Sequence, residues 1–161
     1  MKSIDTVEKI HIYKPEVEVV VDMKMRGLCK RPYLDHPFGC PNFGNKKGCP
    51  PGVNNFLENY EQKVGLVAIG FNLAQWIDIR RQEQPDWTKR ALGNLRHWQP
   101  HVRSNLKRLL SEVNINGYEP IYTAEAMGVN FTDTCRRVNI DLEWPPKNWV
   151  YQIALLGRRV T

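Results

Sequence analysis

The stretch CKRPYLDHPFGCPNFGNKKGCPP, residues 29–51, constrains the fold of this chain more than any other segment. It carries Cys29, Cys40 and Cys49 among glycine, proline, asparagine and lysine, and a proline follows two of the three cysteines. This composition is typical of a loop, whereas a free cysteine usually behaves as a small buried hydrophobe. We therefore expect thiolate coordination, more than apolar burial, to give this cysteine segment (residues 29–51) its shape.

The length of the chain, its longest apolar run and its first residues limit the class of protein that it can be. A chain of 161 residues with 42% hydrophobic residues is long enough for one compact core, and no repeat or linker divides it, so we expect a single domain, 1–161. The longest apolar run, Val64–Phe71, is too short to cross a bilayer, and the start MKSIDTVEKI lacks the apolar core of a secretory signal. These features predict a cytoplasmic protein with no membrane partner.

Hydrophobic patterning predicts both strands and helices. The expected strands are Ile10–Lys14, Val17–Met25, Lys63–Leu73, Glu119–Thr123 and Asn148–Arg158, and short helices are expected within Val53–Tyr60 and Asn130–Asn139. The strongest period is that of a long helix from near Asp86 to Val113, which Pro100 should kink or divide because proline supplies no backbone donor. The predicted class is α/β or α+β, with one mixed sheet, a long Pro-kinked helix and a cysteine-bearing loop.

The four cysteines carry the strongest chemical signal. Cytosolic thiols are kept reduced, so four cysteines there indicate metal binding or catalysis before a disulfide framework, with two disulfides as the alternative. The spacing C-x10-C-x8-C lacks the C-x2-C pair of structural zinc sites, and Cys-Pro occurs at the end of the bacterial ferredoxin cysteine run. Three thiolates leave a site one ligand short, so Cys135 is the natural fourth ligand, unless it is an ordinary core cysteine.

A centre with several thiolates is negative, and cations surround these cysteines. The flanking cations are Arg26, Lys30, Arg31, Lys46, Lys47, Arg136 and Arg137, and the formal net charge of the chain is +6. They would keep the thiolates deprotonated and raise the reduction potential of a cluster. The alternative is phosphate binding, with Tyr33, Phe38 and Phe43 as platforms on which bases stack.

The histidines and acids give weaker signals. His97 and His101 are four residues apart, but the glutamate of a zinc-hydrolase H-E-x-x-H motif is absent. His36 could replace a thiolate or donate a hydrogen bond to a cluster sulfur, and otherwise it is a loop histidine in water. Glu125 and Asp133 lie near Cys135 in the sequence, where carboxylates are usually caps or solvated groups.

Two stretches of the chain resemble a family. GCPNFGNKKGCPPG and EAMGVNFTDTCRRVNIDLEWPP are similar to segments of the uncharacterised predicted metal-binding proteins of bacteria and archaea, in the same order, over about a quarter of the chain. The resemblance implies metal binding, as an iron–sulfur centre, at Cys40 and Cys49 with Cys29 upstream, and it implies no established reaction. Many such proteins have a further cysteine-rich stretch that NINGYEPIYTAEAMG lacks here, so one site is expected.

The sequence thus predicts a protein that binds one 4Fe-4S cluster through Cys29, Cys40, Cys49 and Cys135. A closed cluster would serve electron transfer with a redox partner protein, or structural support. A cluster with three thiolates keeps one iron open for substrate activation or sulfur chemistry, so the sequence leaves open whether the protein is an enzyme. The alternative is a zinc-stapled basic module that contacts nucleic acid or a larger anionic assembly.

Overall fold

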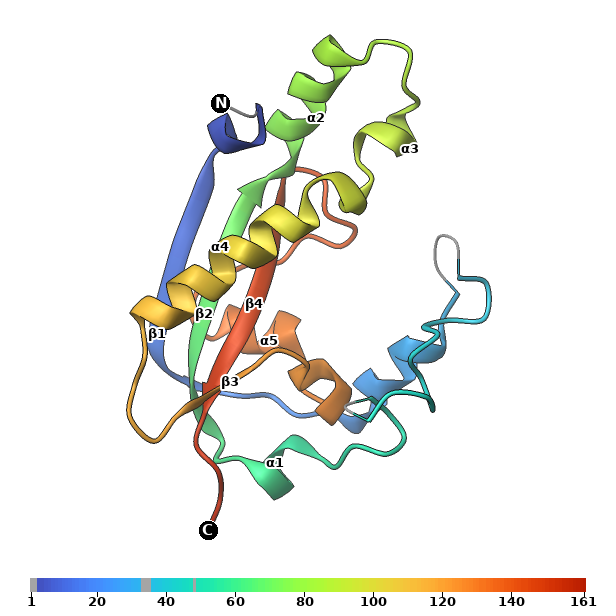
Figure 1. Ribbon diagram of the computed structural model, residues 1–161. Coiled ribbons are helices and arrows are strands. Elements are labelled where there is room, and N and C mark those ends of the chain that lie inside the picture. Colours follow the sequence, from blue (N-terminus) through green and yellow to red (C-terminus); the bar gives the residue numbers. More distant parts are fainter. Residues whose placement is uncertain (1–2, 33–35, 48) are drawn as a thin grey trace. The chain divides into compact units, whose positions relative to one another are not determined.

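The computed structural model describes residues 3–32, 36–47 and 49–161 (Figure 1). Along the chain the elements are η1 (Ser3–Thr6), β1 (Lys9–Glu18), η2 (Met23–Lys30), α1 (Phe56–Asn59), β2 (Lys63–Asn72), α2 (Leu73–Glu83), α3 (Lys89–Leu92), η3 (Leu95–His97), α4 (Gln99–Glu112), β3 (Glu119–Ile121), η4 (Ala124–Met127), α5 (Phe131–Arg136) and β4 (Trp149–Gly157), where η denotes a 3-10 helix.

The four strands form one sheet in the order β1-β2-β4-β3. Backbone hydrogen bonds join the end of β1 to the start of β2, through Val19 N–H and Gln62 O, so these neighbours run antiparallel. β3 pairs antiparallel with β4, with Pro120 opposite Leu156. Pro15 lies in β1, an edge strand, which is the position in a sheet where proline is normally found. The predicted α+β class with one sheet is confirmed. The prediction of a mixed sheet is wrong: the sheet is antiparallel, because the start of β2 also lies beside the end of β4, where Glu61 N–H donates to Arg158 O.

The chain divides into two compact units. The first contains Met1–Tyr13, Val67–Asn114 and Asp141–Ile153, and the second contains Lys14–Leu66, Ile115–Ile140 and Ala154–Thr161. The long strands β1, β2 and β4 each contribute residues to both units. The prediction of one domain rests on the sequence alone and stays a prediction.

The first unit has an aromatic and aliphatic core. Phe71 of β2 stacks on Trp98, with 5.6 Å between ring centroids, and both side chains are buried. Trp98 directly precedes α4, whose inner face buries Val102, Leu106 and Leu110. The expected long helix is divided into α3, η3 and α4, and Pro100 lies in the first turn of α4, where its missing N–H would have no helical partner. The predicted division at proline is therefore confirmed.

The second unit contains the end of β1, the start of β2, the end of β4 and all of β3. Val20 N–H donates to Thr134 Oγ1 of α5 over 3.0 Å, and Asn130 N–H donates to Val20 O over 2.8 Å. Tyr60 O–H donates to Glu119 Oε1 of β3 over 2.6 Å. These contacts tie Val20 to α5 and Tyr60 to β3.

Two segments differ from the expected pattern. The strand expected over Val17–Met25 ends at Glu18, and Met23–Lys30 forms a 3-10 helix because Asp22 Oδ1 accepts Lys24 N–H over 2.9 Å as an N-terminal cap. The strand expected over Lys63–Leu73 ends at Asn72, and residues 73–83 form α2 directly after it (Figure 1). The sequence pattern assigned no element to residues 74–83. No helix within residues 3–32, 36–47 and 49–161 is long and apolar enough to span a membrane.

Candidate functional site

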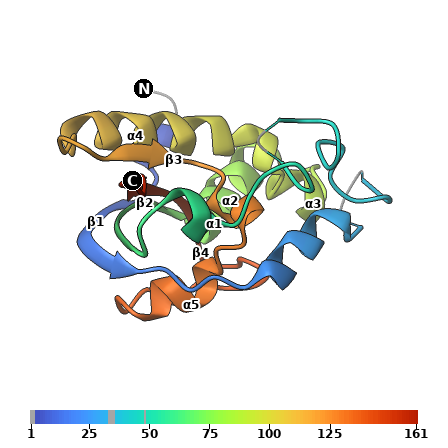
Figure 2. The same ribbon diagram turned by 90° about the horizontal axis from the view of Figure 1, so that it is seen from below.

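Cys29 lies in the last turn of η2, and this helix is anchored at its start. Asp22 N–H donates to Gly128 O over 2.7 Å, and Val21 pairs with Val129 in an antiparallel bridge. η2 packs against η4, which is next to it in Figures 1 and 2. Gly128 makes this approach feasible, since a Cβ there would lie 2.7 Å from Met23 Sδ and its φ is +95°. Residues 128 and 129 and η4, which are distant in sequence, therefore hold η2 in place, and η2 carries Cys29.

Cys40 is brought back to Cys29 by a backbone contact. Cys40 N–H donates to Cys29 O over 2.7 Å. Gly39 has φ +88°, and a Cβ on it would lie 2.5 Å from Cys29 O and 2.7 Å from the carbonyl carbon of Lys30. Only glycine has no Cβ to meet these backbone atoms. Gly39 therefore allows the close backbone approach that brings Cys40 to Cys29.

Cys49 is positioned by a turn and by an arginine. Cys49 N–H donates to Lys46 O over 3.0 Å, and Gly44 N–H donates to Pro50 O over 2.7 Å. Arg26 of η2 then reaches across to the chain after Cys49, donating from Nη2 to Pro51 O over 3.0 Å and to Val53 O over 2.8 Å. One guanidinium therefore fastens the end of the cysteine segment to the helix that carries Cys29.

The Cys29 thiol is affected electrostatically by its neighbours. Cys29, Cys40 and Cys49 are all half-buried. Burial is the largest cause that raises the pKa of Cys29, negative charge on Cys40, Cys49 and Glu125 raises it further, and the Arg26 guanidinium lowers it. The Cys29 thiol therefore lies within electrostatic range of two other thiols and one carboxylate.

Cys135 has a different environment. It lies in α5, its side chain is fully buried, and burial alone raises the pKa of its thiol to about 11. Its carbonyl oxygen accepts N–H groups of Val138 and Ile140, which close the end of α5. Cys40 and Cys49 thus lie within electrostatic range of Cys29, whereas Cys135 is fully buried, where a thiolate forms only with compensation such as a bound metal.

The donor set is chemically suited to a thiophilic centre, since it consists of thiols with a guanidinium nearby. Across residues 3–32, 36–47 and 49–161, no three cysteine, histidine or carboxylate side chains are grouped as ligands of a single metal ion. A cubane cluster binds each thiolate to a different iron atom, so it takes sulfurs that stand farther apart than those around one ion. In donor type, the three thiols are candidate ligands for such a cluster.

The histidines and the second acid have other contacts. The His97 ring lies 5.2 Å from the Trp87 ring, centroid to centroid, and His101 Nδ1 lies 3.9 Å from Asp5 Oδ1. Asp133 accepts from Asn130 Nδ2 over 2.9 Å and pairs with Arg136 over 3.3 Å, as expected of a carboxylate in a first helical turn. His36 is half-buried within the cysteine segment. The proposed stacking residue Tyr33 lies outside the described residues.

Glu125 has a role that sequence reasoning missed. The residue is exposed, yet burial among surrounding protein atoms raises the pKa of its carboxyl group. It belongs to η4, the element that packs on η2, and its charge acts on the Cys29 thiol. No local sequence signal places residue 125 beside residue 29, because only the packing of η4 on η2 does so.

Comparisons of the chain with protein-family models, with curated proteins and with solved structures find no match.

Proposed function

We propose that this protein binds one 4Fe-4S cluster through Cys29, Cys40 and Cys49, with Cys135 as the predicted fourth ligand. One observation carries the proposal: three thiols spread over residues 29–49 lie close enough for two of them to shift the pKa of the third. A cluster is favoured over zinc by the Cys-Pro context and by the absence of a C-x2-C pair in the sequence.

Neighbouring groups of this chain would support such a centre. Arg26 lowers the pKa of the Cys29 thiol, so it favours the thiolate that a metal requires. Gly39 and Gly44 both have positive φ, so the segment turns at these two positions where other residues would be strained. When bound, a cluster would supply electron transfer or structural support, or Lewis acidity at an iron that lacks a protein thiolate.

The deciding experiment is metal and acid-labile sulfide analysis of protein prepared without oxygen. We expect brown protein with iron and sulfide in equal amounts, close to four of each per chain as the cluster formula requires. Colourless protein with stoichiometric zinc would overturn the cluster and would support the alternative, a zinc-stapled basic module.

Single variants assign the ligands. Cys29→Ser, Cys40→Ser and Cys49→Ser should each lose most of the iron, because serine is a poor ligand for this centre. Phe38→Ala is the matched control in the same segment, since its side chain is 94% exposed. Iron content that stays at the wild-type level in two of the three serine variants would remove the proposed site.

Nucleic-acid binding, the role of the alternative module, has its own measurement. Phosphate contacts release counterions, so the affinity for a polynucleotide would fall steeply as salt concentration rises. A dissociation constant that is independent of salt would argue against this role.

A further inference from the structure

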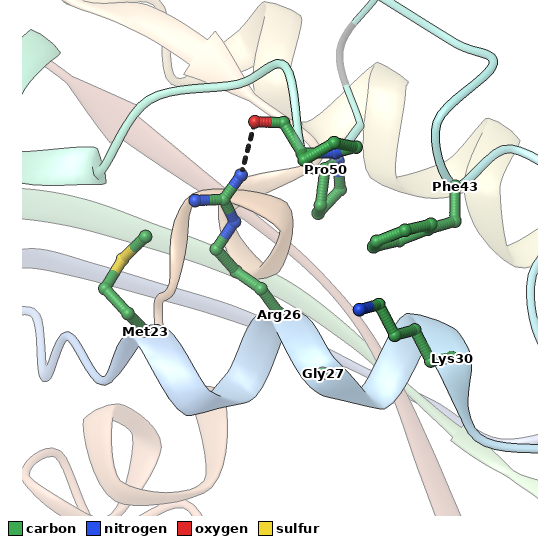
Figure 3. A pocket seen from close by; sticks show the side chains of 7 residues that line it. Met23, Arg26, Gly27, Lys30, Phe43 and Pro50 are labelled. Atoms are coloured by element: carbon green, nitrogen blue, oxygen red, sulfur yellow. Dashed lines mark hydrogen bonds between the residues drawn. The ribbon is translucent and has the colours of Figure 1, made fainter.

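A separate cavity of about 260 Å³ lies between η2 and the cysteine segment. Figure 3 shows its lining side chains, which are Met23, Arg26 and Lys30 from η2, Phe43 from the middle of the segment, and Pro50 and Pro51 from its end. None of these six belongs to the ligand set proposed for the metal centre. The cavity opens to solvent, so a small molecule could enter it without a change in the backbone.

The charge of the cavity is positive. Arg26 and Lys30 both line it, and none of its lining residues that the structure describes is acidic. Arg26 is held in place, because its Nη2 donates to Pro51 O, the hydrogen bond drawn in Figure 3, and to Val53 O. Its buried Nε has no hydrogen-bond partner among the residues that the structure describes. A fixed guanidinium loses little side-chain freedom when an anion arrives, which favours binding.

The opposite wall is flat and apolar. Lys30 Nζ lies 4.9 Å from the centroid of the Phe43 ring, and the two side chains face each other in Figure 3. Pro50 is fully buried and contributes a rigid ring to the same wall. An aromatic face beside an ammonium group suits a planar ligand that carries a negative charge at one edge.

We propose that this pocket binds a small planar organic anion, with its ring against Phe43 and its carboxylate or phosphate group at Lys30 and Arg26. The volume lies just below the range of drug-sized pockets, which begins at about 300 Å³, so the ligand has one ring and few further atoms. The pocket is a second site on the chain and needs no metal for any of its contacts.

The test is an NMR titration of the whole chain with benzoate and with phenyl phosphate, which separate the two anionic groups. Benzamide lacks the charge, and inorganic phosphate lacks the ring. We expect saturable shifts at η2 and at residues 43–51 with at least one of the two aromatic anions, and weak or no saturation with benzamide and inorganic phosphate. A ligand with so few atoms binds weakly, and NMR titration measures such affinities directly.

Matched variants tie the signal to the pocket. Lys30→Gln should weaken binding about tenfold, the equivalent of one charge-assisted hydrogen bond, and Phe43→Leu about fivefold, the equivalent of one aromatic contact. Lys46→Gln and Phe38→Leu change the same residue types in the same segment outside the cavity, and they should bind as the wild type does. Lys30 is exposed, so its variant should fold.

Two results would overturn the proposal: no saturable shift with either aromatic anion, or saturation that Lys30→Gln and Phe43→Leu leave within twofold of wild type. The titration is run on metal-free protein and on protein as isolated. Binding to both forms supports the pocket whatever the metal analysis shows, so a failure of the cluster and a failure of the pocket remain distinguishable.

Discussion

Gly39 and Cys29 are in direct backbone contact: a Cβ on residue 39 would lie 2.5 Å from the Cys29 carbonyl oxygen, which also accepts the N–H of Cys40. This contact joins the two ends of the twelve-residue stretch CKRPYLDHPFGC. The position of Cys40 therefore depends on residue 39 having no Cβ atom.

Gly39→Ala should therefore destabilise the protein and lower its iron content. The added Cβ meets backbone atoms, and the φ of +88° strains any L side chain, so we expect a loss of about 3 kcal/mol from the two effects together. Urea unfolding and iron analysis measure the two consequences. Gly52→Ala is the control, because its Cβ would meet its nearest atom at 3.9 Å. Equal stability and equal iron in both variants would contradict the assigned role of Gly39.

Thr134 should protect the amide of Val20 from hydrogen exchange. Its Oγ1 accepts Val20 N–H over 3.0 Å, and its side chain is fully buried. Thr134→Val keeps the shape but removes the acceptor, which should cost about 1–3 kcal/mol and speed exchange at Val20. Thr134→Ser keeps the hydroxyl and should keep the protection. The same exchange rate at Val20 in the two variants would show that this hydrogen bond does not anchor α5.

Tyr60 should make stability sensitive to alkaline pH. Burial raises the pKa of Tyr60 from 10.0, and its hydrogen bond to Glu119 raises it further. A raised folded-state pKa means that the stabilisation is complete below pH 10.0 and is lost as pH rises through the folded-state pKa. Tyr60→Phe should cost about 1 kcal/mol at neutral pH and should remove this part of the alkaline loss. Unfolding free energies from pH 8 to 11 test the sign; an unchanged slope in the variant would refute it.

Cys135→Ser addresses the fourth ligand. If Cys135 completes the centre, as the sequence predicts, the variant should lose iron and its optical spectrum should change. Unfolding of the metal-free variant is measured alongside, since serine in a fully buried site also costs stability by itself. Full iron content with an unchanged spectrum would leave a site of three thiolates and would place Cys135 in the core.

Several elements follow from local pattern alone. The apolar run of Val64–Phe71 became β2, where every residue of the run is buried, because a continuous hydrophobic stretch of that length suits a central strand. Pro100 divided the predicted helix near its own position, since proline fits only the first turn. Asn130 caps α5 through its side chain, which accepts Asp133 N–H.

Other elements were not accessible to pattern. α2 buries only Leu73 and Trp76, so its helical period is faint, and its place directly after β2 is set by Asn72, whose side chain caps it. η2 replaced an expected strand because Asp22 caps it and because Gly128 lets η4 pack against it, and residue 128 lies far along the sequence. The alternation of polar and apolar side chains alone could not distinguish a helix from a strand in these two segments.

The sequence by itself determined the chemistry of this protein: thiols in a segment without a core, cations around them, and glycines before two of the cysteines. Only the tertiary structure decided that Cys40 and Cys49 act on Cys29, while Cys135 of α5 is buried. It also decided that Arg26, Lys30 and Phe43 line one cavity. The physical reason is that residue type and spacing encode reactivity and local backbone preference, whereas neighbours distant in sequence are chosen by how helices and loops pack together.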